Sequence, residues 1–325
     1  MKIFVAGASG AIGQRLVPLL VSRGHEIAAM TRTPAKARLL YELGAAPVVA
    51  DGLDRDAVVA AVTRAAPEVV VHEMTSLAAA TNLRRFDKVF ALTNRLRTEG
   101  TDHLLEAARR AGARRLVAQS FAGWNYERSG GAVKTEDDPL DPSPPRSMRR
   151  SLAAFVHLES VVVGATDLEG IALRYGGLYG PGTSTALDSP FVEAVRRRRL
   201  PIIGDGAGVW SFVHVDDAAS ATLAAVERGE PGVYNVVDDA PARTNVWLPE
   251  FARIVGAKPP RHVPAWLGRL VAGEAVVVMF TSARGASNAK AKRDLGWRLQ
   301  YSTWRHGFRT GLSDAAQRQE IEQPA

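Results

Sequence analysis

The feature that most constrains the fold is a glycine-rich loop close to the start of the chain. A strand-like run, Lys2–Ala6, leads into Gly7, Gly10 and Gly13, and a helical pattern with an apolar stripe follows directly. Glycines at this spacing allow a tight turn and leave backbone N–H groups open to a phosphate, and the start of the helix adds a partial positive charge. Between a strand and a helix, this loop predicts a dinucleotide-binding unit.

We expect this loop to hold the pyrophosphate of a nicotinamide dinucleotide through its glycines together with Ser9, Ala11 and Ile12. Past the second predicted strand there is no carboxylate to bind a ribose diol. Arg32, helped by Lys36, instead suits a 2′-phosphate, which favours NADP(H) over NAD(H). The alternative is an exposed arginine on a loop.

Strand-like and helical segments alternate over the first 120 residues, which implies an α/β fold with a doubly wound parallel sheet covered on both faces. Pro18 interrupts the first helical pattern and should kink the helix or lie near its first turns. Residues 127–150 are polar and proline-rich, which excludes a helix or a central strand there. The five strand-like runs are Lys2–Ala6, Glu26–Met30, Ala46–Val49, Val69–His72 and Leu116–Gln119.

Later in the chain, a helix is predicted from about Ser151 to Val163, with strands at Gly170–Tyr175, Trp210–His214 and Val233–Val237. There is no cysteine, which excludes disulfides, thiolate catalysis and cysteine-ligated metals. The net charge is +7, but no groove-reading motif accompanies the arginines, so we expect no nucleic-acid partner. No apolar run is long enough to span a bilayer and no signal peptide precedes the first strand, so we expect a cytoplasmic protein without membrane contact.

Several segments taken together resemble the extended short-chain dehydrogenase/reductase superfamily, the NAD-dependent epimerase/dehydratase family, over roughly residues 1–310. Besides the glycine loop they are Asn94 with Gly100-Thr101, Leu173–Gly182, Ile203–Gly206, Phe212–Ala218 and Ala291–Trp297.

This resemblance implies a Rossmann-type cofactor domain over residues 1–176, with a return segment at about 209–240. A smaller C-terminal α/β substrate domain would comprise 177–208 and 241–315, before a flexible tail at 316–325. It also implies an NAD(P)-dependent oxidoreductase or epimerase acting on a small carbonyl, hydroxyl or sugar-like substrate.

The resemblance also implies further site residues. Asp51 or its adjacent backbone would contact adenine, although Asp51 equally suits a cap for the next helix. The cofactor lining would include Gly52, His72, Met74, Asn94 and Tyr175, and the substrate would meet Trp124, Arg149 and Tyr179. His214, Asp216 and Asp217 look like a metal cluster in isolation, but the resemblance assigns them to capping the following helix, so no metal is expected.

The family's catalytic pattern is a Ser or Thr with a Tyr-x-x-x-Lys pair, and here the sequence departs from it. The helical segment Arg149–Glu159 contains neither tyrosine nor lysine, and no Tyr-x-x-x-Lys occurs anywhere in the chain. By register, Phe121 takes the place of the catalytic hydroxyl and Ser120 a structural position; an offset of one residue would restore Ser120.

Ser120, Tyr126 and His157 are therefore the candidates for proton transfer. A tyrosine acts as an acid when a nearby cation lowers its pKa, and Arg149 or Arg150 could supply that cation. His157 is a candidate because the imidazole side chain can serve as acid or base, but it also suits a purely structural place on its helix.

Three functions remain open: a reductase or epimerase with non-standard acid–base residues, a non-catalytic NADP(H) sensor or scaffold, and a redox-neutral isomerase or cyclase. Relatives often form dimers through the helix at 151–163, and its apolar residues Leu152, Phe155, Val156 and Leu158 permit a homodimer.

Overall fold

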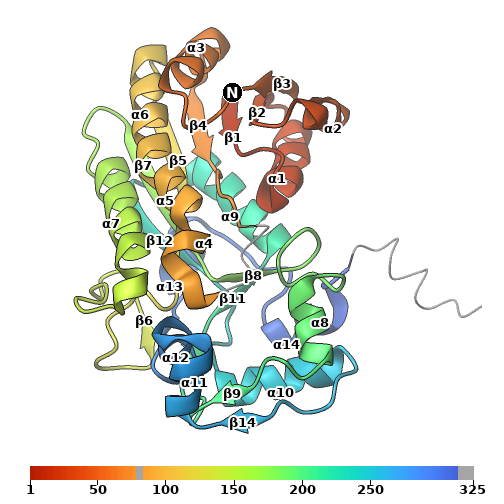
Figure 1. Ribbon diagram of the computed structural model, residues 1–325. Helices are drawn as coiled ribbons and strands as arrows, with labels where there is room; N and C mark the ends of the chain where they lie inside the picture. The colour runs from red at the N-terminus through yellow and green to blue at the C-terminus, as the bar shows by residue number, and fades with distance from the viewer. Residues whose placement is uncertain (78–82, 314–325) are drawn as a thin grey trace, which may run out of the picture.

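The computed structural model describes residues 1–77 and 83–313, and a parallel sheet of seven strands forms its centre (Figure 1). The strand order is β12-β7-β5-β4-β1-β2-β3. The order reverses between β1 and β4, and this reversal opens the crevice where such sheets bind ligands. The strands are β1 (Lys2–Ala6), β2 (Glu26–Thr31), β3 (Ala46–Val49), β4 (Val69–His72), β5 (Arg115–Phe121), β7 (Glu169–Tyr175) and β12 (Gly232–Val236).

The predicted strands over Lys2–Ala6, Ala46–Val49 and Val69–His72 are confirmed at both ends. All four residues of β4 are buried, because helices cover a central parallel strand on both faces. The edge strand β3 has three exposed residues out of four and carries Pro47, which a central strand would not accept.

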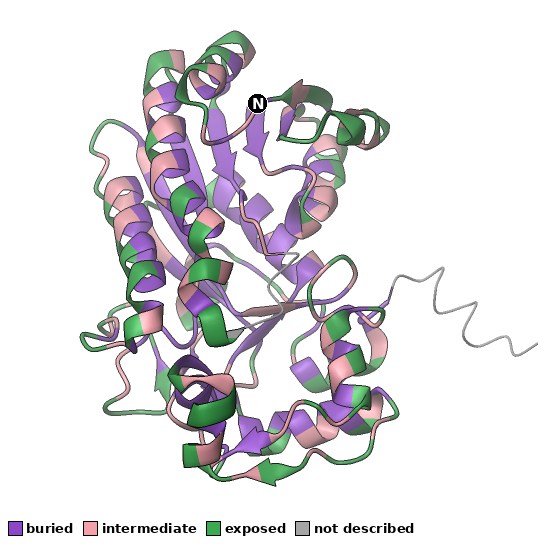
Figure 2. Ribbon diagram, viewed as in Figure 1, coloured by how far each residue is buried: buried purple, intermediate pink, exposed green. Residues whose placement is uncertain are grey.

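Two helical layers cover the sheet (Figures 1 and 2). On one face, α1 (Ala11–Ser22) packs on α9 (Val215–Arg228). On the other lie α3 (Arg55–Ala65), α6 (Glu99–Ala111) and α7 (Arg149–Val163). The remaining helices are α2 (Ala37–Glu42), α4 (Phe86–Val89), α5 (Ala91–Arg97), α8 (Pro190–Arg196), α10 (Thr244–Ile254), α11 (Ala265–Ala272), α12 (Glu274–Thr281), α13 (Ala289–Asp294) and α14 (Trp304–Thr310), with 3₁₀ turns at Pro34–Lys36, Leu83–Arg85 and Arg146–Met148.

Pro18 lies beyond the first turns of α1, at the eighth position, and the helix continues past it to Ser22. It lies on the exposed side, where water can bond the carbonyl that its missing N–H leaves free. In residues 127–150 the structure has no central strand, as predicted, but it has the two-residue strand β6 (Val133–Lys134), which pairs with β15 (Gly285–Ala286). The exclusion of a helix is wrong at the end of this segment, because the last proline is Pro145: a 3₁₀ turn at Arg146–Met148 follows it, and α7 begins at Arg149, two residues before the predicted start.

A second core, rich in aromatic rings, is shared by the C-terminal elements with α4, α7 and the segment after β5, through Phe86, Phe155 and Trp124. The predicted strand Trp210–His214 is split at Ser211 into β10 (Val209–Trp210) and β11 (Phe212–His214), which pair with different partners. These partners and the remaining pair are β13 (Ala242–Arg243), β8 (Gly177–Tyr179), and β9 (Ile202–Ile203) with β14 (His262–Val263). The predicted tail at 316–325 lies outside the described residues.

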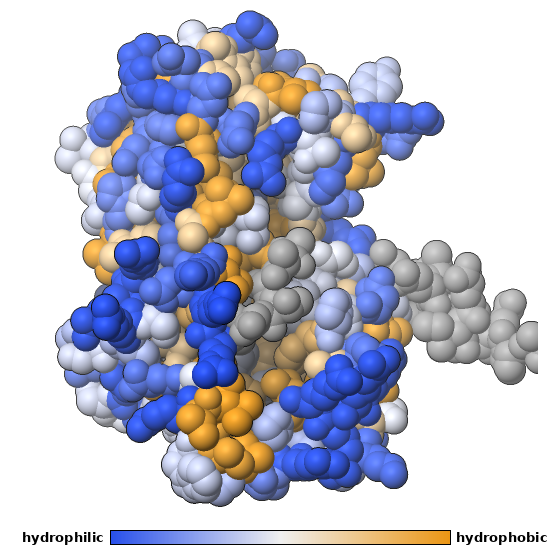
Figure 3. Space-filling view, in the orientation of Figure 1, coloured by the Kyte–Doolittle hydropathy of each residue, from blue (hydrophilic) through white to orange (hydrophobic). Residues whose placement is uncertain are grey.

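Helix α11 carries an exposed apolar face made by Trp266, Leu270 and Val271. Figure 3 shows an orange patch low in the view, where Figure 1 places α11 and α12. Among the described residues, no helix combines the length and the apolar character that crossing a membrane requires.

The apolar residues that were predicted to permit a dimer through α7 mostly face inward. Leu152, Phe155 and Leu158 are buried within the chain, and only Val156, at 46% exposure, faces outward. These three side chains are therefore not available to a partner.

Candidate functional site

The glycine loop forms an open phosphate cradle at the start of α1. Gly10 is the N-cap residue, no side chain caps the helix, and its first turn contains no acidic residue. Gly7 has a φ of +91°, and a Cβ there would lie 2.5 Å from the carbonyl of Glu73. A Cβ on Gly13 would lie 2.6 Å from Ala8 Cα. At Gly10 it would meet only Gly7 O, at 3.2 Å, so the space beyond Gly10 suits a ligand.

Two cations flank this cradle beyond the end of β2. Lys36 Nζ donates to Ser9 O over 3.4 Å, and Ser9 Oγ lies 2.9 Å from Thr31 Oγ1. Arg32 is exposed and forms no ion pair with any described residue. The residues present thus fit a dinucleotide at α1 and provide positive charge at the place expected for a ribose phosphate.

Asp51 does not cap α3, because that cap is Asp54, whose carboxylate accepts from Ala57 N over 3.0 Å. Asp51 instead accepts from Leu53 N over 3.0 Å and closes the turn after β3. The next residue, Gly52, lies so close to the buried Met74 that a side chain at that position would collide with its sulfur.

His72 orders the segment that follows β4. Its Nδ1 accepts from Met74 N over 3.2 Å, and its Nε2 donates to Leu96 O over 3.2 Å, which fixes the neutral tautomer. Burial lowers the pKa of His72 to about 4. Both ring nitrogens are engaged and the side chain is buried, which argues against proton transfer by His72, and its cofactor-lining role stays a prediction.

Beside it, a buried acid joins β4 to β7 and α9. Tyr175 Oη donates to Glu73 Oε1 over 2.9 Å and lies 2.6 Å from Thr222 Oγ1. The other oxygen, Glu73 Oε2, is buried without a hydrogen-bond partner among the described residues. Burial raises the pKa of Glu73 to about 8, so this side chain is mostly neutral at pH 7. In the sequence Glu73 only follows His72, which was predicted to line the cofactor, and nothing in the pattern pointed to this buried acid.

Glu73 should make stability fall as pH rises. Glu73 has a pKa of about 8 in the folded protein and an ordinary value of 4.5, so the folded protein retains a proton that the unfolded chain releases. The stability that Glu73 contributes is fully present below the ordinary pKa and is lost as pH rises through the folded pKa. As pH rises from about 5 to about 9, we expect the free energy of unfolding of Glu73→Gln to increase relative to that of wild type, by on the order of a few kcal/mol. Urea unfolding of both proteins checks this, and parallel pH profiles would contradict it.

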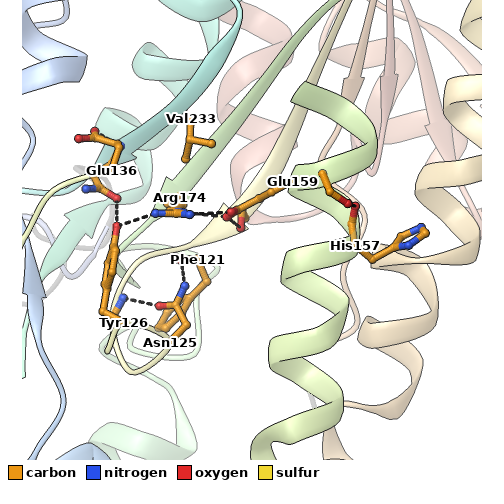
Figure 4. A network of polar contacts seen from close by, with 12 residues as sticks. Phe121, Asn125, Tyr126, Glu136, His157, Glu159, Arg174 and Val233 are labelled. Carbon is orange, nitrogen blue, oxygen red and sulfur yellow. Dashed lines mark hydrogen bonds and ion pairs between the residues drawn. The ribbon is translucent and has the colours of Figure 1, made fainter. Parts of the chain in front are cut away.

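A buried polar network occupies the space between β5, β7 and α7 (Figure 4). Arg174 forms a double hydrogen bond with Glu159, at 2.8 and 2.6 Å, and donates to Tyr126 Oη over 3.1 Å. Ser120 Oγ donates to Glu159 over 2.6 Å, and Tyr126 donates to Asn235. Both predicted hydroxyls are therefore engaged in the same structural network.

Within this network the tyrosine is a poor acid. Tyr126 is fully buried, and burial raises its pKa to about 12 although Arg174 lies beside it. The cation expected to lower the pKa of Tyr126 was Arg149 or Arg150, but the cation found there is Arg174, whose charge is already shared with Glu159.

His157 and Arg149 lie on the outer side of α7. His157 Nε2 pairs with Asp102 of α6 over 2.8 Å, and Figure 4 shows its ring pointing away from Arg174 and Glu159. Arg149 is exposed and lines a shallow groove together with His157 and Pro142. The structure therefore does not bring His157 together with Ser120 and Tyr126, and it places Arg149 beside the same outer groove as His157.

On the inner side of α7, Ser151 and Phe155 are separated by the same four positions as the missing Tyr-x-x-x-Lys pair. Ser151 Oγ accepts from Asn94 Nδ2 over 3.0 Å. Phe155 stacks on Phe121, with 5.9 Å between the ring centroids. The short Ser151 side chain and the rings of Phe121 and Phe155 therefore lie where β5 packs against α7.

These two phenylalanines belong to a larger group, here called the aromatic cluster. The buried Trp124 lies 6.0 Å from Phe155 and 6.1 Å from Phe121. The cluster comprises Phe86, Phe90, Phe121, Trp124 and Phe155.

Against the cluster lies a cation that sequence reasoning missed. The Arg97 guanidinium carbon lies 4.1 Å from the centroid of the Phe155 ring. The one available signal was a basic residue on the same helical face as Asn94, three positions later.

Tyr179, predicted to meet substrate, is fully buried in the smaller part of the molecule. Its ring packs edge-on against His214 and Phe308, at 5.2 and 4.9 Å. His214 caps α9 by accepting from Asp216 N over 3.1 Å, and Asp217 accepts from two backbone N–H groups at 300 and 301. No group of possible metal ligands occurs among the described residues.

Known proteins resemble this chain over nearly its whole length. A 3-diazoavenalumate denitrifying reductase from a Streptomyces species is 47% identical over 311 residues, which is 95% of this chain and 99% of that protein. A UDP-glucose 4-epimerase from Mycolicibacterium smegmatis is 29% identical, and the match covers 92% of this chain and 94% of that protein. The solved UDP-glucose 4-epimerase of Thermus thermophilus in complex with NAD is 26% identical, with a TM-score of 0.71 over 96% of this chain and 98% of that one.

The sequence model of the NAD dependent epimerase/dehydratase family matches residues 3–237. This confirms the resemblance drawn from the motifs and supports a nicotinamide cofactor and an enzyme of the reductase and epimerase type. The chain belongs to the NAD dependent epimerase/dehydratase family.

Proposed function

We propose that this protein is a nicotinamide-dependent reductase that replaces the diazo group of an aromatic substrate by hydrogen and releases dinitrogen. The observation that carries the proposal is the stack of Phe121 on Phe155 between β5 and α7, the two elements on which the resemblance expects the catalytic hydroxyl and the Tyr-x-x-x-Lys pair. Because two phenyl rings fill this place in the described part of the chain, it suits a reaction that requires no proton donor there. The relative that is 47% identical is named for such a reaction.

The bound cofactor would supply a hydride equivalent. Reducing a carbonyl by hydride creates an alkoxide that must receive a proton, so an acid is needed beside it. Reducing an aryl diazonium ion differs: the hydride provides the electron pair of the new bond to hydrogen, and the C–N bond breaks to release neutral dinitrogen. The products are an arene, dinitrogen and oxidised cofactor, and no proton is transferred.

The chain's own residues would bind and orient the reactants. The start of α1 around Gly10 would hold the pyrophosphate through free backbone N–H groups. The aromatic cluster would pack against the substrate ring, exclude water and favour a planar arene over a sugar. Ser120 and Tyr126 would hold β5, β7 and α7 together instead of transferring protons.

The test incubates the purified protein with NADPH and a benzenediazonium salt carrying a phenolic hydroxyl. We expect nicotinamide absorbance to fall with equal release of dinitrogen, and deuterium from C4-deuterated NADPH to appear on the arene carbon. Ketones and UDP-sugars serve as alternative substrates. Turnover of those compounds without diazonium reduction contradicts the proposal, as does tight NADPH binding without any turnover, which would indicate a sensor.

We further propose that the cofactor is NADP(H), because Arg32 and Lys36 flank the glycine loop and no carboxylate lies at the end of β2. Removing both charges in the double variant Arg32→Leu/Lys36→Met should weaken NADPH binding roughly tenfold to a hundredfold, the loss expected for charged hydrogen bonds to a phosphate. NADH binding should stay unchanged.

Titration of each nucleotide against the double variant measures this preference. Arg38→Leu is the matched control, since Arg38 is exposed on the adjacent α2 and pairs only with Glu42 in the described part of the chain. An equal loss for NADPH and NADH would contradict a 2′-phosphate site.

A further inference from the structure

Arg97 is a buried cation that finds no counter-charge in the described part of the chain. Its side chain is buried, with 5% of the residue exposed, and no described residue accepts a hydrogen bond from Nε. No carboxylate pairs with it within residues 1–77 and 83–313. Burial lowers the pKa of Arg97 to about 9, and the guanidinium stays charged at neutral pH.

The groups around this cation do not neutralise it. Phe155 faces the guanidinium carbon at 4.1 Å, and its ring contributes a cation–π attraction of roughly 2 kcal/mol when water is excluded. His72 interacts with the same charge but is neutral. Leaving a buried charge unpaired costs several kcal/mol, which exceeds the attraction that one aromatic ring provides. We therefore expect an anion to bind beside Arg97.

The phosphates of the cofactor are poor candidates for that anion. Their cradle is built by other elements, the start of α1 and the end of β2, where Gly10 and Lys36 lie. Arg97 lies on α5 instead, faces Phe155 of α7 and interacts with His72 at the end of β4, and Phe155 itself stacks on Phe121 of the aromatic cluster. An anion placed here would belong to a molecule whose ring contacts the aromatic cluster.

We propose that Arg97 binds an anionic oxygen, carboxylate or phenolate, of an aromatic substrate whose ring packs on the aromatic cluster. The choice of an aromatic substrate rests on the proposed function. A guanidinium offers paired N–H donors that match a carboxylate or a phenolate, and the low-polarity surroundings strengthen the bond. Arg97 is thus a specificity residue, selecting acidic arenes over neutral ones.

The experiment measures binding without turnover, by calorimetric titration of the NADP⁺-loaded protein with 4-hydroxycinnamate, which has both oxygens and no diazo group. We expect Arg97→Leu to lose tenfold to a hundredfold in affinity, as for a charged hydrogen bond, and Arg97→Lys to lose less. The control is Arg95→Leu, an exposed residue on the same helix that pairs with Glu99, and it should bind like wild type.

Two analogues identify the oxygen. The methyl ester lacks the carboxylate and 4-methoxycinnamate lacks the phenol, and the analogue without the oxygen held by Arg97 should bind wild type and Arg97→Leu equally. Arg97→Gln, which keeps hydrogen-bonding capacity without charge, replaces Arg97→Leu if that variant does not fold.

Unchanged affinity for 4-hydroxycinnamate in the folded Arg97→Leu or Arg97→Gln variant overturns the inference. So does a selective loss of NADPH binding, which would assign Arg97 to the cofactor. A protein that binds the probe through Arg97 but reduces no diazonium salt overturns the proposed function and leaves this site standing.

Discussion

Replacing Glu159 by leucine is expected to destabilise the protein by about 3–5 kcal/mol, the loss that follows when one partner of a buried ion pair is removed. Both members of the pair are almost inaccessible, with side-chain exposures of 9% for Glu159 and 6% for Arg174. The variant leaves the Arg174 charge buried without its partner and removes the acceptor of the Ser120 hydroxyl. Urea unfolding at neutral pH measures the loss.

Two further variants separate the stability loss of Glu159→Leu from the effect of removing any charged side chain. Asp167→Leu removes one partner of the surface pair Arg109–Asp167, whose members are about half exposed, and should cost less than about 1 kcal/mol. The double variant Glu159→Leu/Arg174→Met removes both buried charges and should recover much of the lost stability. If Glu159→Leu costs no more than Asp167→Leu, the network is not what holds β5, β7 and α7 together.

The elements of the sheet could be predicted because each is encoded locally. A buried parallel strand is a short apolar run between turn residues, and β4 shows this pattern from Val69 to His72. The glycine loop could be predicted for a similar reason, since Gly7 and Gly13 are required by the backbone beside them. The split of β10 from β11 at Ser211 could not, because it depends on two different pairing partners elsewhere in the chain.

The aromatic cluster was harder to predict, because its residues come together only in the fold. Phe121, Phe155 and Trp124 resemble ordinary core residues in the sequence, and only the packing of β5 against α7 makes them neighbours. His157 attracted attention because imidazole titrates near neutrality. Helical phase argues against it: Phe155 and Glu159 face inward four positions apart, and His157, midway between them, faces outward.

Substitution of Gly10 by valine should abolish tight cofactor binding while leaving the fold intact. The Gly10 backbone, with φ −80° and ψ 176°, is open to any residue, and a Cβ would meet only Gly7 O, at 3.2 Å. A valine side chain would therefore fill the space of the pyrophosphate instead of colliding with the core. Losing two charged hydrogen bonds to phosphate corresponds to roughly 3 kcal/mol or more, a hundredfold weaker NADPH binding.

Stability should change little in this variant, by about 1 kcal/mol, since glycine is only a moderately better N-cap residue than valine. Gly7→Val is the contrasting variant: its φ of +91° and the Glu73 carbonyl 2.5 Å from the added Cβ should destabilise the fold itself. Nucleotide titration and urea unfolding of both variants separate the two effects. A Gly10→Val protein that binds NADPH as wild type does would place the pyrophosphate elsewhere, whereas loss of binding in a stable protein would identify the space beyond Gly10 as the phosphate site.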